Sequence, residues 1–225
     1  MDWSPILISM KTASVSIVIT FFLGILAAWL VVSMKNERMK IILDGILTLP
    51  LVLPPTVAGF FFLYLFGVKR PIGIFFLQFF GVKIAFSWTA TVLAAVVMSF
   101  PLMYRSARGA FEQVDPNLMA AARTLGMSEW SIFYKVLIAN AMPGIVSGGV
   151  LAFARGLGEF GATAMIAGNI AGKTRTLPMA VYSEVAAGNM DAAYRYVAII
   201  VVIAFLSVIL MNRAALKESK KRGPF

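Results

Sequence analysis

Long apolar segments dominate the sequence and leave few ways for it to fold. An α-helix needs about 20 apolar residues to cross a bilayer whose hydrocarbon core is about 30 Å thick. Five segments meet this requirement, and they lie at about 12–33, 41–66, 85–104, 136–168 and 196–211. In lipid the backbone amides need internal hydrogen-bond partners, which a helix provides within one segment. The sequence therefore predicts an all-α, polytopic transmembrane helical bundle with about five spans.

The composition excludes a water-soluble domain and most kinds of catalysis. Of the 225 residues 60% are hydrophobic and only 13% are charged, and the mean hydropathy is +0.87. Soluble domains carry about 25% charged residues. The chain has no cysteine and no histidine, and histidine is the commonest general base and metal ligand. We therefore expect neither an enzyme nor a metal site, and no bound cofactor.

The positive charges indicate an orientation in the membrane. The formal net charge is +10, but the basic residues lie in short stretches between the apolar runs, as orientation signals do, and we expect no nucleic-acid partner. With the N-terminus outside, twelve basic residues fall in cytoplasmic segments and six in outer ones. The cytoplasmic set is Lys35, Arg38, Lys40, Arg105, Arg108, Arg123, Lys135, Arg213, Lys217, Lys220, Lys221 and Arg222. The outer set is Lys69, Arg70, Lys83, Lys173, Arg175 and Arg195. Because cytoplasmic loops carry the excess of Lys and Arg, we expect the N-terminus outside and the C-terminus inside.

Three segments outside the spans have distinct characters. The loop 67–83 is rich in phenylalanine, and we interpret it as an outer segment at the headgroup boundary, in contact with membrane lipid. Residues 108–135 form a cytoplasmic loop, and residues 213–225 form a basic cytoplasmic tail. The whole chain, 1–225, is expected to be a single transmembrane domain with a core at about 8–212.

Prolines interrupt two of the predicted spans. Pro50, Pro54 and Pro55 lie in the second apolar run, and Pro101 lies near the end of the third. Proline removes a backbone donor and kinks a helix, which a bilayer tolerates where neighbouring helices or a water-lined cavity satisfy the freed carbonyl. Two interpretations stay open: a bent helix that lines a pathway, or an ordinary packing kink.

The cytoplasmic loop contains a short helix with both ends marked. Asp115 is a favoured N-cap residue, Pro116 suits the first helical position, and Gly126 suits the left-handed residue that closes a helix. Ser128 is expected to cap a second helix that leads into the fourth span. One face of the short helix is apolar, and it is formed by Leu118, Ala121, Ala122 and Leu125. Such a helix either docks another protein or packs on its own bundle.

A charged pair lies in the otherwise uncharged fourth run. Arg155 and Glu159 are four residues apart, a spacing that places them on one face of a helix. Charges within a span are costly and face the bundle interior or a water-filled path. The pair either lines a translocation pathway for an anion or forms a structural salt bridge. We favour the salt bridge, because a permeation path should not bind its cargo tightly.

The loop and several blocks of the spans resemble permeases of binding-protein-dependent ABC importers. The pattern of their cytoplasmic EAA loop is matched by residues 120–126 (AAARTLG), Val136 and Ile138, with Ala120 in place of the usual glutamate and Ala139 in place of proline. Further blocks are similar to the molybdate permease branch: 49–59 (LPLVLPPTVAG), 85–88 (AFSW), 98–103 (MSFPLM), 151–163 (LAFARGLGEFGAT) and 174–178 (TRTLP). Sulfate and thiosulfate permeases are close relatives, but they more often carry tyrosine and serine at the positions of Phe160 and Ala162.

The resemblance implies a multi-pass protein of the cytoplasmic (inner) membrane with a type I importer fold. It implies two copies of the chain, two ATP-binding subunits and an extracytoplasmic molybdate-binding protein, with molybdate or tungstate as cargo. The residues that would couple to the ATPase are Ala120, Ala121, Ala122, Arg123, Thr124, Leu125 and Gly126. The sequence contains no Gly-x-x-x-x-Gly-Lys-Ser/Thr motif, so ATP would be bound by the partner.

An ion-coupled secondary transporter and an ion channel are the alternatives from other classes. The first needs more titratable residues at membrane depth than Glu159 and an inverted repeat, and the second needs a repeated filter motif.

Overall fold

The computed structural model describes residues 2–221, and for residues 211, 212 and 214–221 it describes the backbone alone. The regular structure of these residues is helical throughout, which confirms the predicted all-α bundle. Four continuous stretches of the described chain are long and apolar enough to span a membrane: Ser4–Val32, Trp88–Glu112, Glu129–Leu157 and Met190–Leu210. The second predicted span, at about 41–66, is broken, because α2 (Glu37–Val52) and α3 (Pro55–Phe66) meet at an angle of 108°.

Several predicted boundaries were wrong. The third span, α5 (Trp88–Glu112), continues beyond residue 104, and α11 (Met190–Lys221) begins before residue 196. The fourth span ends at Leu157, after which the chain turns and forms the short helix α9 (Gly161–Ile166). Hydropathy could not locate this end, because the apolar run continues through the turn. In the predicted basic tail, 213–225, only Arg213 has a described side chain, which is exposed.

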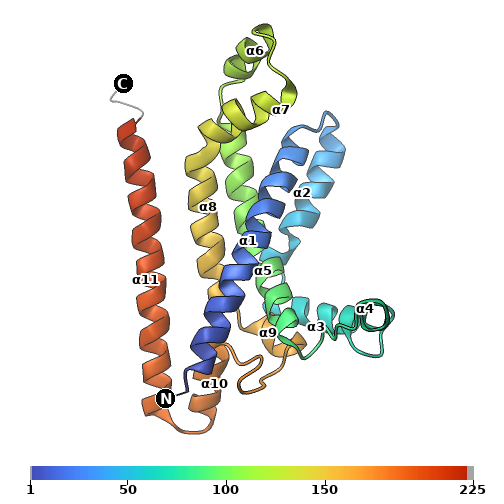
Figure 1. Cartoon of the computed structure of the whole chain (residues 1–225), viewed down its shortest axis with the longest axis vertical. Coiled ribbons are helices and arrows are strands. Elements are labelled where there is room, and N and C mark those ends of the chain that lie inside the picture. Colours follow the sequence, from blue (N-terminus) through green and yellow to red (C-terminus); the bar gives the residue numbers. More distant parts are fainter. Residues whose placement is uncertain (1, 222–225) are drawn as a thin grey trace.

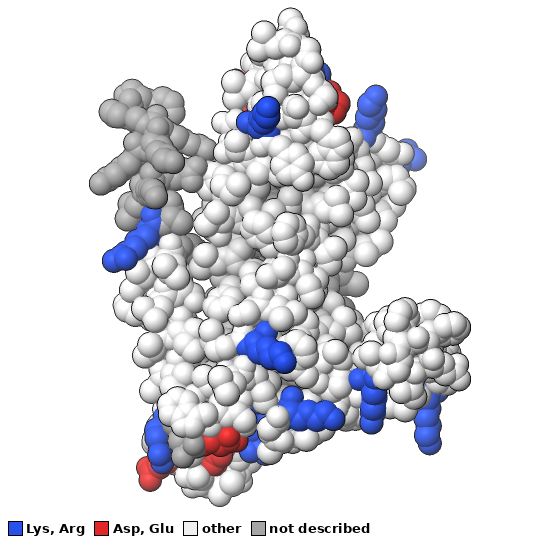
Figure 2. All heavy atoms as spheres, in the orientation of Figure 1, with Lys and Arg blue, Asp and Glu red and all other residues white. Residues whose placement is uncertain are grey.

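Most of the long helices stand side by side, while the short helices gather at the two ends (Figure 1). At one end lie α3, α4 (Pro71–Phe80), α9 and α10 (Leu177–Ala186); α6 (Pro116–Thr124) and α7 (Glu129–Ile132) project at the other. Helix α1 (Ser4–Val32) begins at the first end, and α11 runs from there towards the second, as an odd number of crossings requires. In Figure 2 the charged side chains gather towards both ends, and uncharged atoms cover most of the surface between them.

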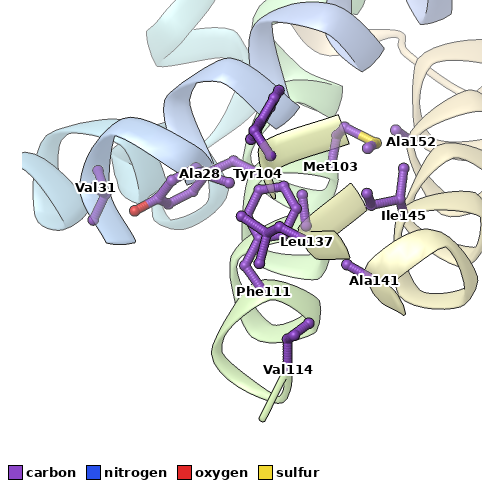
Figure 3. Close-up of a cluster of buried hydrophobic side chains, with 12 residues drawn as sticks. Ala28, Val31, Met103, Tyr104, Phe111, Val114, Leu137, Ala141, Ile145 and Ala152 are labelled. Atoms are coloured by element: carbon purple, nitrogen blue, oxygen red, sulfur yellow. The ribbon is translucent and has the colours of Figure 1, made fainter. Parts of the chain in front are cut away.

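The main core lies where α1, α5 and α8 (Ala139–Leu157) pack together near the end that carries α6. Figure 3 shows side chains from these helices and from the π-helical segment Phe133–Ile138 converging on one cluster. The labelled members are Ala28, Val31, Met103, Tyr104, Phe111, Val114, Leu137, Ala141, Ile145 and Ala152. This cluster holds together the helix ends from which α6 and α7 project.

Buried hydroxyl pairs join α1 to α5. The hydroxyl oxygens of Thr12 and Thr91 lie 3.0 Å apart, and those of Thr20 and Ser99 lie 3.2 Å apart. All four side chains are buried, so each hydroxyl finds its partner within the protein and not in lipid. These pairs link α1 to α5 at two levels along the two helices.

Candidate functional site

The first candidate site is α6, and its beginning follows the prediction. The Asp115 carboxylate accepts a hydrogen bond of 2.9 Å from the backbone N–H of Asn117. Pro116 is the first helical residue, where the N–H that proline lacks would have no partner in the helix. The capping carboxylate and the proline therefore fix where the helix starts.

The end of α6 is a Schellman motif, and Gly126 closes the helix, as predicted. The N–H of Gly126 donates to the carbonyl of Arg123 at 2.9 Å, and the N–H of Met127 donates to the carbonyl of Ala122 at 3.1 Å. Gly126 has a φ of +78°, in the left-handed region that glycine adopts without strain. These bonds satisfy carbonyls that the last turn of a helix leaves open, and they direct the chain back towards α7.

The predicted apolar face of α6 is divided between the protein and the exterior. Ala122 is buried, and the partly buried Met119 packs against the main core. Leu118, Ala121 and Leu125 are exposed, and Leu125 keeps 81% of its surface accessible. The helix thus rests on the bundle through one side and presents small and apolar side chains on the other.

Arg123 has a partner that the sequence did not reveal. Its guanidinium donates to both carboxylate oxygens of Glu129, at 2.7 and 3.1 Å, and so joins α6 to the start of α7. These hydrogen bonds and the charge of Glu129 raise the pKa of Arg123 above its usual value. Ser128 accepts from the N–H of Ser131 and caps α7, as predicted. The charge of Arg123 is therefore already engaged within the loop.

The chain enters the fourth span through a π-helical segment. Residues Phe133–Ile138 form this wider helix between α7 and α8, and the side-chain amide of Asn140 donates to the carbonyl of Val136 at 2.7 Å. Segments of this kind are short insertions in α-helices and occur frequently at functional sites. Helix α7 is thus joined to α8 by a helical segment of altered geometry.

The second candidate site is the turn between α8 and α9. Glu159 does not lie on the α8 helix face, because α8 ends at Leu157, and this part of the prediction was wrong. The ion pair nevertheless forms: Arg155 Nη1 lies 2.7 Å from Glu159 Oε2. The other carboxylate oxygen accepts from the N–H of Ala162 at 2.8 Å, and Glu159 is only 2% exposed. The buried carboxylate therefore ties the end of α8 to the beginning of α9.

This turn packs directly against the bend between α2 and α3. A Cβ added to Gly161 would lie 2.9 Å from the Cβ of Pro55, and one added to Gly59 would lie 2.7 Å from the Cα of Ala162. Pro54 lies in the bend and Pro55 begins α3, whereas Pro50 and Pro101 lie inside the continuous helices α2 and α5. The glycines thus allow close contact within one chain, and Gly161 belongs to α9 and not, as predicted, to the fourth span.

A third group of polar side chains attaches α2 to α5 and was missed by the sequence analysis. Asp44 forms an ion pair with Arg108 and accepts a hydrogen bond of 2.8 Å from the hydroxyl of Tyr104. Arg108 also contacts Glu112 at 2.9 Å. All 16 residues of α2 are described and none is buried, and this cluster holds the helix together with the partly buried Leu43 and Leu47, which pack against the main core. A carboxylate within an apolar run was the available signal.

The candidate residues thus form two groups and not one. The seven predicted coupling residues lie together at the projecting end, and Arg155 and Glu159 lie at the turn that contacts Pro55. Among the described residues no three carboxylates come together as metal ligands. The first group lies on a helix with an exposed side, and the second connects the end of α8 to the start of α9.

The chain is similar along its whole length to permeases of known transport systems. It is 42% identical over 223 residues to the molybdenum transport system permease protein ModB of Escherichia coli K12, covering 99% of this chain and 97% of the relative. It is 38% identical to the ModB protein of Haemophilus influenzae, with coverage of 99% and 97%. The fold is similar to that of the inward-facing MetNI methionine ABC transporter, with a TM-score of 0.75, 18% identity and coverage of 95% and 94%.

A family profile matches most of the sequence. Residues 20–220 match the profile described as "Binding-protein-dependent transport system inner membrane component". The match includes α6, the helix break after α8 and the second part of α1, from residue 20. The chain is therefore a multi-pass inner-membrane protein, and it belongs to the family of binding-protein-dependent transport system inner membrane components.

Proposed function

We propose that this chain is the membrane permease subunit of an ATP-driven importer that moves molybdate across the cytoplasmic membrane. The observation that carries the proposal is the full-length similarity to permeases named for molybdenum transport. The same observation favours molybdate over sulfate or thiosulfate as cargo. Tungstate, a dianion of nearly the same size and shape, is expected to enter by the same route.

The chain supplies the path, and ATP is hydrolysed by a separate subunit. The absence of a phosphate-binding Gly-x-x-x-x-Gly-Lys-Ser/Thr motif in the sequence supports this division of labour. The complex contains two copies of this chain, two ATP-binding subunits and an extracytoplasmic binding protein, with lipid around the spans. The chain itself needs no cofactor.

Helix α6 is the element that docks on the ATP-binding subunit. Support comes from its exposed apolar and small side chains, Leu118, Ala121 and Leu125, at a projecting end of the molecule. Both helix ends are fixed by capping, so this surface is held in one shape before it meets a partner. The coupling residues are Ala120, Ala121, Ala122, Arg123, Thr124, Leu125 and Gly126.

The Arg155–Glu159 pair serves the structure and does not bind the cargo. Both oxygens of the Glu159 carboxylate are engaged, one by Arg155 and one by the N–H of Ala162. The α2–α3 bend, with Pro50, Pro54 and Pro55, is placed beside the pathway, because a sharply broken helix is tolerated at membrane depth where it lines a water-filled cavity or is buried in protein. Pro101 is buried inside α5, which favours a packing role.

Uptake into proteoliposomes tests the function. The chain is reconstituted with its ATP-binding subunit, and the binding protein and radioactive molybdate are added on the outer side. We expect uptake that requires ATP inside the vesicles and the binding protein outside, and that persists in excess sulfate. Equal competition by sulfate would assign the sulfate-type cargo. Uptake driven by a proton or sodium gradient without ATP would contradict the proposal.

A further inference from the structure

Four aromatic side chains lie where α7 meets the bundle, and we name them the aromatic bridge: Trp29, Phe111, Trp130 and Phe133. The rings of Trp130 and Trp29 are stacked, with centroids 6.3 Å apart and planes 16° apart. The ring centroid of Phe133 lies 5.0 Å from that of Trp29 and 6.5 Å from that of Phe111. The bridge thus connects α7 and the π-helical segment to α1 and α5.

The bridge runs from the surface into the main core. Trp130 is 64% exposed, whereas Phe133 and Phe111 are buried within the cluster that joins α1, α5 and α8. An exposed tryptophan held flat against a second tryptophan forms a rigid contact, because aromatic rings lose little conformational freedom on packing. A displacement of α7 therefore presses directly on α1.

The connection from α6 to α8 is less direct than the connection to α1 through the aromatic bridge. Helix α6 is linked to α7 by the two-pronged contact between Arg123 and Glu129, and it also packs on the π-helical segment. That segment separates α7 from α8, so the two are not turns of one regular helix. A movement of α6 thus reaches α8 through a segment of altered geometry, but it reaches α1 through stacked rings.

We propose that Trp130 and Trp29 are positioning residues that transmit the movement of α6 to the α1–α5 pair during ATP-driven transport. The inference rests on the proposed function. A different role for such rings would be anchoring at the membrane–water interface, where Trp and Tyr are enriched. Anchoring depends on each ring separately, whereas transmission depends on the contact between the two.

Tyr134 provides a matched control. It is 59% exposed and stacks on Trp130, with centroids 5.4 Å apart, within the same helical stretch. Its removal takes away an exposed aromatic ring with its contacts to Trp130 and Phe133, and it leaves the contact between Trp130 and Trp29 in place. The reconstituted complex of this chain, its ATP-binding subunit and the binding protein is then assayed for ATP hydrolysed per molybdate imported.

Trp130→Leu should raise the number of ATP molecules hydrolysed per molybdate imported about fivefold. An effect of this size corresponds to the interaction energy of one aromatic pair. Trp29→Leu should do the same, and the double variant should be no worse than either, because each single change already removes the Trp29–Trp130 contact. Trp130→Phe and Tyr134→Leu should stay near wild type. Size-exclusion chromatography checks assembly, and Trp29→Leu decides the question if Trp130→Leu does not assemble.

If wild-type uptake is ATP-driven, two results would still overturn the inference. One is an unchanged ratio in Trp130→Leu or Trp29→Leu, and the other is an equal rise in Tyr134→Leu, which would assign the rings to the membrane interface. A wild-type complex that shows no ATP-driven uptake of molybdate would instead contradict the proposed function. The two failures are therefore distinguishable in one assay.

Discussion

Two arginine–glutamate pairs mark the two ends of the fourth span, and they differ in burial and not in distance. The shortest nitrogen–oxygen distance is 2.7 Å in both Arg123–Glu129 and Arg155–Glu159. The side chains of the first pair are 51% and 72% exposed, and those of the second are 28% and 2% exposed. Exposed pairs contribute little to stability, whereas a buried carboxylate that loses its partner is strongly unfavourable. The two pairs have the same shortest distance, but we expect the loss of the buried pair to destabilise the protein far more than the loss of the exposed one.

The difference matches the role that we propose for each end. The exposed pair joins α6 to α7 where water can replace either partner, so it can rearrange as a partner docks. The buried pair fixes a helix break against the α2–α3 bend, where Glu159 has Arg155 and one backbone N–H as its partners. We therefore expect the break between α8 and α9 to be rigid, and the link between the capped helix α6 and α7 to be adjustable.

The largest expected effect is that of Arg155→Ala. It leaves the Glu159 carboxylate buried without its counter-ion, at a cost near the lower end of about 3–5 kcal/mol, because the Ala162 N–H remains. The yield of assembled, monodisperse protein in detergent should fall sharply. The double variant with Glu159→Ala should recover assembly and some uptake. Normal assembly with lost uptake in both variants would instead favour a pathway role.

A smaller loss is expected for Gly59→Ala. The added Cβ would lie 2.7 Å from the Cα and 2.8 Å from the carbonyl oxygen of Ala162, so α3 and α9 would separate, at about 1–3 kcal/mol. Gly45→Ala is the control, since no described atom lies within 4 Å of its Cβ position and alanine favours a helix by about 0.5–1 kcal/mol. Thermal unfolding midpoints should move in opposite directions. Equal shifts would show that this contact does not hold the break.

The smallest effect on assembly is expected for Arg123→Ala. Because both side chains of its pair are exposed, the yield and the unfolding midpoint should stay at the wild-type values. Uptake should fall modestly as α6 loses its link to α7, and Arg123→Lys should restore part of it. A loss of assembled protein comparable to that of Arg155→Ala would remove the distinction between the two ends.

Hydropathy and capping rules predicted much of the molecule. The spans exist, and Asp115, Gly126 and Ser128 act as the caps that their types and spacing indicate. These features are local, since each depends on residues within about one helical turn. The prolines indicated a bend near Pro54 but not its angle, which depends on how α9 packs against α3.

The features that the sequence could not predict depend on residues far apart or on turns. Thr12 and Thr91 are separated by 79 positions, and Asp44 lies 60 positions from Tyr104. Glu129 is six residues from Arg123, across a turn that no helical spacing describes. Glu159 was expected on a continuous helix, because an apolar run conceals the end at Leu157.

Co-purification of the ATP-binding subunit with Gly126→Val tests the central claim, that α6 couples this permease to its ATPase. Gly126 has a φ of +78°, and beyond its chain neighbours no described atom lies within 4 Å of its Cβ position, so the strain of about 1–2 kcal/mol is conformational. Gly126→Asn is the control, because asparagine adopts this conformation more readily. We predict that the valine variant inserts and assembles but loses its ATPase and its uptake, while the asparagine variant keeps both. Undiminished ATPase binding and uptake in Gly126→Val would contradict the account.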